Sequence, residues 1–320
     1  KASTMIVAFG NPVYDFIKTP TVTTGERVLS GCSTNGCLAL ARLGHATTLV
    51  GRIGADYHAR LQADLQRYGI GAVTQLSEQT GGFGLIYDER GDRTLDLLGE
   101  AGPIESVPEA CRQAEAIIIG PILRETSFEL IEQVHAASAA PLFLDPQGLL
   151  RRIGPHGRIE HFFPPELAQI APLFRVIKAN ELETEVITGV NPRAHGTEAL
   201  RRLRALGCAI AIVTLAEAGS LIDDGARQYA IPAYATTAHD PTGAGDTYMA
   251  GFIHAYLEDP ADLYRAGCYG AATASIWIES TGPDAPIGLA EVERRAASLL
   301  QREAVLRVGL GSRELPAPCG

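Results

Sequence analysis

A loop of small residues flanked by aspartates is the segment of the chain best suited to chemistry. Residues 239–247 read His-Asp-Pro-Thr-Gly-Ala-Gly-Asp-Thr and lead into a helical pattern. The first N–H groups of a helix have no partner within it, and with the helix dipole they attract anions. Asp246 falls in that first turn and would face the anion. The loop itself consists of Gly243, Ala244 and Gly245.

A carboxylate beside a phosphate-binding loop is what an enzyme that phosphorylates an alcohol requires. Asp246 would accept the proton of the hydroxyl group, while backbone amides stabilise negative charge on the transferring phosphoryl group. An ordinary helix with an acidic residue in its first turn has the same pattern, and for this segment taken alone that interpretation is the stronger one. The rest of the chain must decide between the two.

Short apolar runs alternate with amphipathic segments along most of the chain. Helical patterns cover residues 61–68 and 197–206, and the sequence Thr-Ser-Phe-Glu at 126–129 resembles a capping box that opens another helix. Continuous apolar strands between helices indicate a parallel sheet covered on both faces. The predicted strands are residues 5–9, 47–50, 116–119, 142–144, 175–178 and 209–215.

Two segments depart from this alternation. Residues 11–30 are extended and rich in threonine, and residues 82–99 have the pattern of a β-hairpin. We expect them to pair into a small separate sheet that acts as a lid. No linker divides the chain, so residues 1–306 are predicted to form one domain and residues 307–320 a loosely ordered tail.

The composition limits the classes of function. Hydrophobic residues make up 46% of the 320 residues and charged residues 20%, which favours a large core over disorder. The formal net charge of −10 argues against a nucleic-acid partner, because nucleic acids are bound mainly through Lys and Arg. The six cysteines form no CxxC pair, which indicates reduced thiols rather than disulfides or a zinc site.

No membrane association is predicted from the sequence. The longest apolar runs are far too short to cross a bilayer. Residues 5–9 follow the start of the chain without the basic region and long apolar stretch of a signal peptide. We therefore expect a cytoplasmic protein.

Several enzyme classes lack their motifs in this chain. The lysines are Lys1, Lys18 and Lys178, and none follows a glycine, which excludes a P-loop enzyme. The segment after the first strand, Gly-Asn-Pro at residues 10–12, does not supply the GxGxxG of a nicotinamide enzyme. The GxSxG motif of α/β-hydrolases and the HExxH motif of metalloproteases are also absent.

Four segments, in this order, resemble the signatures of the ribokinase-like (PfkB-type) carbohydrate kinase family. They are residues 35–44 (Asn-Gly-Cys-Leu-Ala-Leu-Ala-Arg-Leu-Gly), 50–56 (Val-Gly-Arg-Ile-Gly-Ala-Asp), 180–183 (Asn-Glu-Leu-Glu) and 240–246 (Asp-Pro-Thr-Gly-Ala-Gly-Asp). The resemblance covers roughly residues 5–302. Three positions differ from the family pattern. Pro241 replaces the usual second residue of the last motif, Ser30 replaces the first glycine of a Gly-Gly pair, and Ala216 replaces a glycine of the nucleotide-side loop.

The resemblance implies a fold, an activity and partners. The implied fold is an α/β ribokinase-like three-layer sandwich with a central mostly parallel sheet and a small β-sheet lid. The implied activity is transfer of the γ-phosphoryl group of ATP, with Mg²⁺, to a hydroxyl of a small sugar or polyol, with Asp246 as the base. A homodimer is expected, because many family members are dimers. A nucleoside kinase and a non-catalytic sugar-binding sensor on the same fold are the alternatives.

Residues that match the family's substrate motifs are Asp15, Gly31 and Asn35. The resemblance implies that Asp15 binds substrate hydroxyls and that Gly31 and Asn35 line the same pocket. Without the resemblance, Asp15 would be assigned to a turn and Asn35 to a helix start. The turn Asp-Pro-Gln-Gly at residues 145–148 follows a strand, where α/β proteins place ligand contacts, but a plain turn is equally compatible.

The residues that match the family's nucleotide side also have structural explanations. Asn180 and Glu183 have the spacing of a helix cap, whereas the resemblance implies that they organise water and Mg²⁺ around the phosphates; both can hold at once. Thr214 and Gly219 lie in a segment that resembles the family's nucleotide-binding loop.

Two further positions complete the nucleotide side. Ala272 would let adenine approach a helix of small residues, or would serve helix packing alone. Family members often bind a monovalent cation such as K⁺ near the position of Asp240, which makes Asp240 a candidate ligand.

Overall fold

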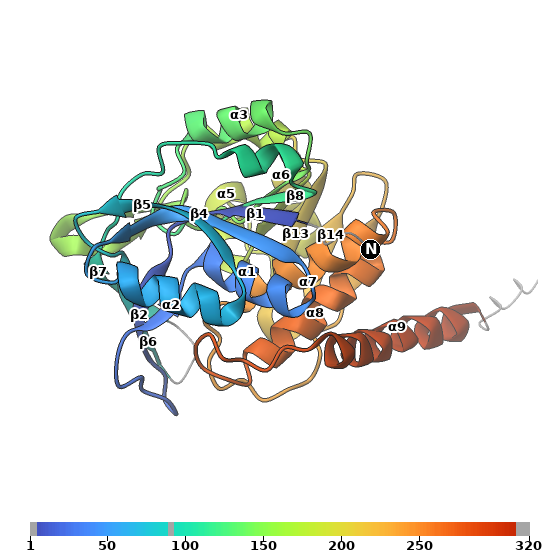
Figure 1. Cartoon of the computed structure of the whole chain (residues 1–320). Coiled ribbons are helices and arrows are strands. Elements are labelled where there is room, and N and C mark those ends of the chain that lie inside the picture. The colour runs from blue at the N-terminus through green and yellow to red at the C-terminus, as the bar shows by residue number, and fades with distance from the viewer. Residues whose placement is uncertain (1–4, 89–92, 312–320) are drawn as a thin grey trace, which may run out of the picture.

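A nine-stranded sheet forms the centre of the molecule (Figure 1). The computed structural model describes residues 5–88 and 93–311. The strand order is β15-β14-β13-β12-β9-β8-β1-β4-β5, and every pair from β13 to β5 is parallel. The strands are β1 (Met5–Phe9), β4 (Ala46–Gly54), β5 (Gly71–Ser77), β8 (Ala116–Ile119), β9 (Leu142–Leu144), β12 (Val176–Ala179), β13 (Ile210–Thr214), β14 (Ser220–Asp223) and β15 (Gln228–Ile231).

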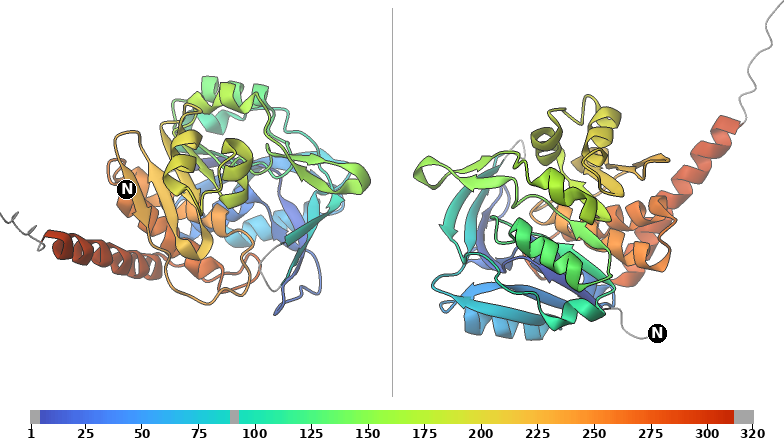
Figure 2. Two further views of the ribbon diagram at one scale, coloured as in Figure 1. Left: turned by 180° about the vertical axis from the view of Figure 1, so that it is seen from behind. Right: turned by 90° about the horizontal axis from the view of Figure 1, so that it is seen from above.

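Helices cover both faces of this sheet, as Figures 1 and 2 show. One face carries α1, α2, α7, α8 and α9, and the other carries α3, α4 and α6. The helices are α1 (Cys32–Arg42), α2 (His58–Tyr68), α3 (Phe128–Ala137), α4 (Leu167–Ile170), α5 (Glu181–Thr188), α6 (Gly196–Arg204), α7 (Ala244–Glu258), α8 (Leu263–Trp277) and α9 (Leu289–Gly311). Short 3₁₀ helices are η1 (Glu109–Gln113), η2 (Pro155–Gly157), η3 (Ala171–Leu173) and η4 (Ala216–Ala218).

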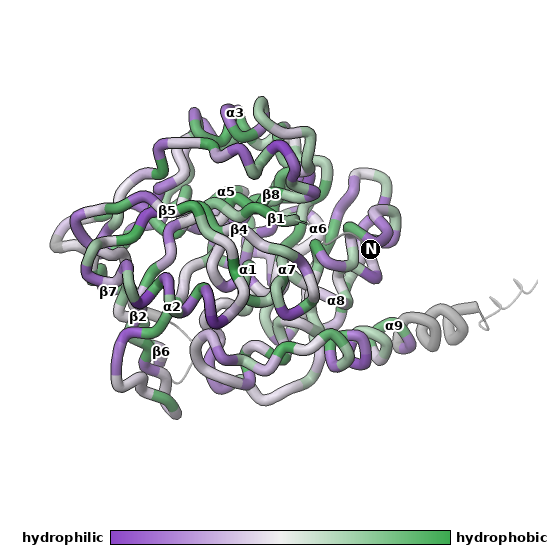
Figure 3. Tube along the Cα trace, viewed as in Figure 1, coloured by the Kyte–Doolittle hydropathy of each residue, from purple (hydrophilic) through white to green (hydrophobic). Residues whose placement is uncertain are grey.

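The strand sequences explain why the sheet is covered on both sides. Side chains alternate between the two faces of a strand, so Ile6 and Ala8 belong to one core cluster and Val7 and Phe9 to the other. All four are fully buried, and the central strands β1 and β8 are hydrophobic along their length (Figure 3). The predicted three-layer α/β sandwich is therefore confirmed.

The predicted lid is a separate four-stranded sheet in the order β3-β2-β6-β7. Its strands are β2 (Val13–Lys18), β3 (Val28–Ser30), β6 (Gly82–Tyr87) and β7 (Arg93–Gly99). The predicted pairing of the two segments is correct, and β2 pairs with β6 in parallel, while the other two pairs are antiparallel. The turn of the hairpin, residues 89–92, lies outside the described residues.

A second small hairpin was not predicted. Strands β10 (Arg151–Ile153) and β11 (Ile159–His161) pair in an antiparallel arrangement, and the hairpin reaches the lid through a bridge between Arg158 and Asp96. In Figure 2 this hairpin extends beside the lid sheet. The small sheet and this hairpin thus meet, although they come from segments far apart in the sequence.

Strands β14 and β15 make one edge of the main sheet antiparallel, so the sheet is mostly parallel, as predicted. Two other expectations differ from the structure. The N-cap of α3 is Ser127, which accepts the N–H of Leu130, rather than Thr126 one residue earlier. Residues 307–311, expected to begin a loose tail, instead continue α9, and residues 312–320 lie outside the described residues.

None of the helices within residues 5–88 and 93–311 combines the length and the apolar character needed to span a bilayer.

Candidate active site

The loop before α7 is held in a conformation that only glycine tolerates. Gly243 is the N-cap of α7 with φ of 82°, in the left-handed region. A Cβ atom at Gly243 would lie 2.8 Å from both Asn35 Nδ2 and Trp277 Nε1. Trp277 Nε1 donates to the carbonyl of Thr242 at 2.7 Å, and the N–H of Ala244 donates to the Pro241 carbonyl at 3.1 Å. The loop is thus fixed before the helix begins.

Asp246 lies in the first turn of α7 and is only 9% exposed. Its Oδ2 accepts a hydrogen bond from Asn35 Nδ2 at 2.9 Å, and its Oδ1 accepts one from Gln147 Nε2 at 3.3 Å. Burial raises the pKa of Asp246, the nearby charge of Asp145 raises it further, and Lys178 opposes both effects. A carboxylate whose pKa is raised towards neutrality is a better general base than an exposed one.

A buried lysine provides the positive charge of the site. Lys178 Nζ lies 2.6 Å from Asp145 Oδ2, and both side chains are at most 3% exposed. A Cβ atom at Gly245 would lie 2.6 Å from Lys178 Nζ, so the ammonium group adjoins the glycine loop. Burial would lower the pKa of Lys178, but the surrounding carboxylates, chiefly Asp145, raise it. Lys178 therefore stays charged and adds to the anion-binding potential of the helix start.

Asn180 and Glu183 form the helix cap that their spacing predicts. The Asn180 side chain accepts the N–H of Glu183 at 2.9 Å, and the Glu183 carboxylate accepts the N–H and the Nδ2 of Asn180 at 2.9 and 2.8 Å. Burial and the charge of Asp145 raise the pKa of Glu183 to about 7. Their role towards Mg²⁺ stays a prediction, and Glu183 is close enough to Lys178 to raise the pKa of that lysine.

The residues predicted to bind substrate lie between the lid and the main sheet. Gly31 is the N-cap of α1 with φ of 117°, and its carbonyl accepts the N–H of Asn35 at 2.8 Å. Asn35 reaches Asp246 directly. Asp15 lies on β2 of the lid, where its Oδ1 accepts the N–H of Phe83 at 2.7 Å. Asp15 thus ties two lid strands together, and its contact with a substrate stays a prediction.

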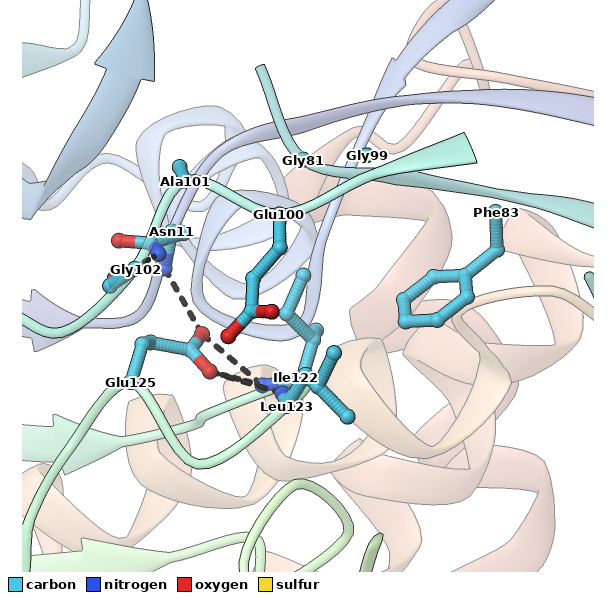
Figure 4. Close-up of a pocket in the computed structure, with 10 residues that line it drawn as sticks. All are labelled: Asn11, Gly81, Phe83, Gly99, Glu100, Ala101, Gly102, Ile122, Leu123 and Glu125. Atoms are coloured by element: carbon cyan, nitrogen blue, oxygen red, sulfur yellow. Dashed lines mark hydrogen bonds between the residues drawn. The ribbon is translucent and has the colours of Figure 1, made fainter. Parts of the chain in front are cut away.

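A small cavity lies beneath the lid (Figure 4). It is lined by Asn11 between β1 and β2, by the start of β6, by the end of β7 with the segment after it, and by the loop after β8. The Glu125 carboxylate accepts the N–H groups of Asn11, Ile122 and Leu123 at 2.8–2.9 Å, and the Glu100 carboxylate points into the cavity. The cavity is therefore polar on one wall, whereas Phe83 forms an apolar wall opposite.

The remaining predicted residues lie further along the chain in the main domain. Thr214 ends β13, and Gly219 turns the chain into β14 with φ of 91°. A Cβ atom at Gly219 would lie 2.1 Å from the Ile231 carbonyl oxygen, so the turn itself requires glycine. Ala272 is fully buried in the core between the helices. Roles of these three residues towards a nucleotide stay predictions.

Asp240 is a buried carboxylate at the start of the loop. It is 1% exposed, and its Oδ1 accepts the N–H of Thr242 at 2.9 Å. Burial raises the pKa of Asp240, and hydrogen bonds from Thr242 and Thr281 lower it. A buried carboxylate with neutral partners is compatible with the predicted monovalent cation, which stays a prediction.

Three residues near Asp246 were not assigned a role from the sequence: Lys178, Gln147 and Arg151. Lys178 sits inside an apolar strand, where a lysine requires a charged partner, and this was the available signal. For Gln147, the sequence was compatible with either a ligand contact or a plain turn. Arg151 carried no local signal, because its role depends on a hairpin that the sequence pattern does not reveal.

The start of α7 thus carries the buried Asp246 and adjoins the ammonium group of Lys178 on β12, at an edge of the sheet that the lid covers. The chain belongs to the pfkB family of carbohydrate kinases, whose family model matches residues 3–288. Among curated proteins, a cytidine kinase of Thermococcus kodakarensis is 29% identical over 251 residues, covering 73% of this chain and 81% of that protein. A nucleoside kinase of Methanothermobacter thermautotrophicus is 26% identical over 302 residues, covering 87% and 90%.

The solved structures support the same fold. A pyrophosphate-dependent kinase in the ribokinase family, solved with a pyrophosphate analogue and myo-inositol, superposes with a TM-score of 0.77. Its sequence is 21% identical, and the match covers 90% of this chain and 99% of that one. The family match and the named relatives together show that the chain is a kinase of the sugar and nucleoside kinase type.

Replacing Lys178 by methionine should destabilise the protein strongly, because it leaves the buried Asp145 without its cation. We expect the free energy of unfolding to fall by about 3–5 kcal/mol, measured by urea denaturation. The control is Arg193→Met, which removes a 43%-exposed arginine from Glu181 and should cost less than about 1 kcal/mol. Equal effects of the two substitutions would contradict this assignment.

Proposed function

We propose that this protein is an ATP-dependent kinase that phosphorylates a hydroxyl of a small sugar or polyol, with Asp246 as the base. The observation that supports this most directly is the placement of Asp246 at the start of α7 beside the ammonium group of Lys178. A base and a phosphate-binding site are thus adjacent. Phosphoryl transfer needs little else from the protein, since catalysis rests on positioning and charge stabilisation.

In the proposed reaction the acceptor lies between the lid and the carboxyl ends of the strands. The acceptor oxygen attacks the γ-phosphorus, the bond from that phosphorus to the ADP oxygen breaks, and the hydroxyl proton passes to Asp246. The glycine loop and Lys178 stabilise negative charge on the transferring group. Asn35 and Gln147, which already hold Asp246, orient its carboxylate towards the hydroxyl.

Glu183 fits the predicted outer role towards Mg²⁺. Each of its carboxylate oxygens accepts one hydrogen bond from Asn180 and retains a second lone pair that could accept from a metal-bound water. When bound, Mg²⁺ would neutralise charge on the phosphates of ATP. We also propose Asp240 as a ligand for a monovalent cation such as K⁺.

The class of acceptor rests on the polar groups around Asp246. Amide and carboxylate side chains suit an acceptor with several hydroxyls, and the turn at residues 145–148 and the change at Ser30 favour a polyol or an unusual sugar. A nucleoside is the second candidate, because two of the relatives are named as nucleoside or cytidine kinases. A non-catalytic sensor is disfavoured, because binding alone requires no base such as Asp246.

We further propose a homodimer formed through the lid sheet. Ile86 and Leu98 on this sheet are 40% and 44% exposed. Its outer strands β3 and β7 are also edge strands, which other chains readily pair with.

The experiment that tests the proposed function is a panel assay for release of ADP from ATP and Mg²⁺. The panel contains sugars, sugar acids, polyols and nucleosides, and a parallel set replaces ATP by pyrophosphate. Turnover with a sugar or polyol supports the proposal. Turnover confined to nucleosides would show that the acceptor is a nucleoside rather than a sugar or polyol. Tight binding without turnover would indicate the non-catalytic sensor.

Changing Asp246 to asparagine should remove the base while keeping the shape of the side chain. We expect turnover to fall by a factor of about a hundred or more, the usual scale for losing a general base. Binding of ATP, measured by calorimetry, should be nearly unchanged. The exposed Asp284 provides the matched control, since Asp284→Asn should leave turnover intact. Full activity of the Asp246 variant would disprove its role.

The substitution Glu183→Gln separates the cap from the metal role. Glutamine also completes a capping box, so the thermal unfolding midpoint should change by only a few degrees. The loss of negative charge should raise the Mg²⁺ concentration needed for half-maximal rate by about tenfold, the scale for losing a group that binds water on the metal. If the Mg²⁺ dependence is unchanged and stability falls strongly, Glu183 acts only as part of the helix cap.

Deleting residues 84–97 should open the site to water. If the lid excludes water, the deletion raises hydrolysis of ATP relative to transfer to the acceptor. The measurement compares ADP release with formation of the phosphorylated product. An unchanged ratio would show that the lid does not have this role.

A further inference from the structure

The side chains of Gln147 and Arg151 connect the lid region to Asp246. Gln147 Nε2 lies 3.3 Å from Asp246 Oδ1, and Gln147 Oε1 accepts a hydrogen bond from Arg151 Nη2 at 3.0 Å. Arg151 is the first residue of β10, the hairpin that reaches the lid. The three residues therefore form a continuous chain of hydrogen bonds from the hairpin to Asp246.

Arg151 is held firmly at the start of this chain. Its side chain is 3% exposed although it carries a charge, and its Nη1 donates to the Ile122 carbonyl at 3.1 Å. Its guanidinium lies 6.0 Å from the centre of the Phe83 ring on lid strand β6, at the limit of a cation–π contact. Both Ile122 and Phe83 line the cavity beneath the lid, so Arg151 adjoins the wall of that cavity.

The chemistry of arginine fixes which end of the Gln147 amide faces Asp246. A guanidinium has only donors, so the end of the amide that meets Arg151 must be the oxygen. The NH₂ end then points at Asp246 Oδ1 and donates to it. Without Arg151, the amide could turn and present its oxygen to the carboxylate, which would repel it.

We propose that Arg151 is a positioning residue, which acts through Gln147 to hold the Asp246 carboxylate in the orientation needed to accept the acceptor proton. This inference rests on the proposed function, because it requires Asp246 to be the base. The orientation of Asp246 would then be fixed by three features: the start of α7, the hydrogen bond from Asn35 on α1, and the pair of Gln147 and Arg151.

Charged and titratable groups face Asp246 from several other elements. Asp145, directly after β9, raises the pKa of Asp246, whereas Lys178 on β12 and a hydrogen bond from Cys32 on α1 lower it. Glu183 on α5 acts on the Lys178–Asp145 pair. A donor lost from Asp246 Oδ1 destabilises the ionised carboxylate, so its pKa rises. The acid limb of the pH–rate profile should then move to higher pH.

The test compares Arg151→Met, Gln147→Met and the double variant with the wild type, using the best acceptor from the panel. We expect kcat to fall by about tenfold in each single variant, the effect of losing one hydrogen bond of ordinary strength. The KM for ATP should be unchanged, and the acid limb should shift upward. The double variant should be no worse than either single one, because both act through the same bond.

A matched control is Arg152→Met, the neighbouring arginine on the same strand. Its side chain is 57% exposed and pairs with Glu160, so kcat and the pH profile should stay as in the wild type. Arg151→Lys keeps a donor for Gln147 and should recover part of the lost kcat. If Arg151→Met does not fold, Gln147→Met and Arg151→Lys still provide the kinetic and pH readouts.

The outcomes distinguish this inference from the proposed function. A wild type without turnover on any acceptor would overturn both. An active wild type that loses activity with Asp246→Asn, while the Arg151 and Gln147 variants keep the wild-type kcat and pH profile, would overturn the positioning role alone. Additive losses in the double variant, or a change confined to the KM for the acceptor, would also overturn it.

Discussion

One ammonium group balances the negative charge at the centre of this protein. Lys178 lies against Asp145, and its charge also acts on Asp246 and Glu183. All four groups are buried, where an ion without a partner is far more costly than at the surface. Burial, with the charge of Asp145 added to it, raises the pKa values of Asp246 and Glu183, and the charge of Lys178 opposes that rise. Because Lys178 also adjoins Gly245 at the start of α7, the same charge serves both the buried carboxylates and the predicted phosphate site.

The parallel sheet is what brings these groups together. Asp145 directly follows β9, Lys178 lies near the end of the neighbouring strand β12, and Asn180 directly follows it. Carboxyl ends of parallel strands meet at one edge of a sheet, where ligands of α/β proteins bind. The helices add their starts at the same place: Asn35 in the first turns of α1 and Asp246 in the first turn of α7. The lid and the hairpin of β10 and β11 then cover this edge.

Much of the fold could be predicted from the sequence, because its signals are local. Buried strands such as β1 and β8 are continuous apolar runs, and the glycine loop before α7 stands out by composition. The hairpin of residues 151–161 could not be predicted, since it is short, polar and held by contacts with distant residues. Lys178 and Arg151 were missed for the same reason: their importance lies in partners that only the folded chain brings near. The N-cap of α3 differed by one residue because Thr126 and Ser127 are both good caps.

The hydrogen bonds that hold Asp246 join parts of the chain that are far apart in sequence and are therefore synthesised at different times. The bond from Asn35 closes a loop of 211 residues, and the bond from Gln147 closes one of 99 residues. Contacts of such long range form late in folding, because the entropy of loop closure is overcome only when the strands between them are already paired. The site is consequently absent from a nascent chain until α7 has been synthesised and docked. A partly folded chain therefore lacks the assembled site and cannot use up a phosphoryl donor.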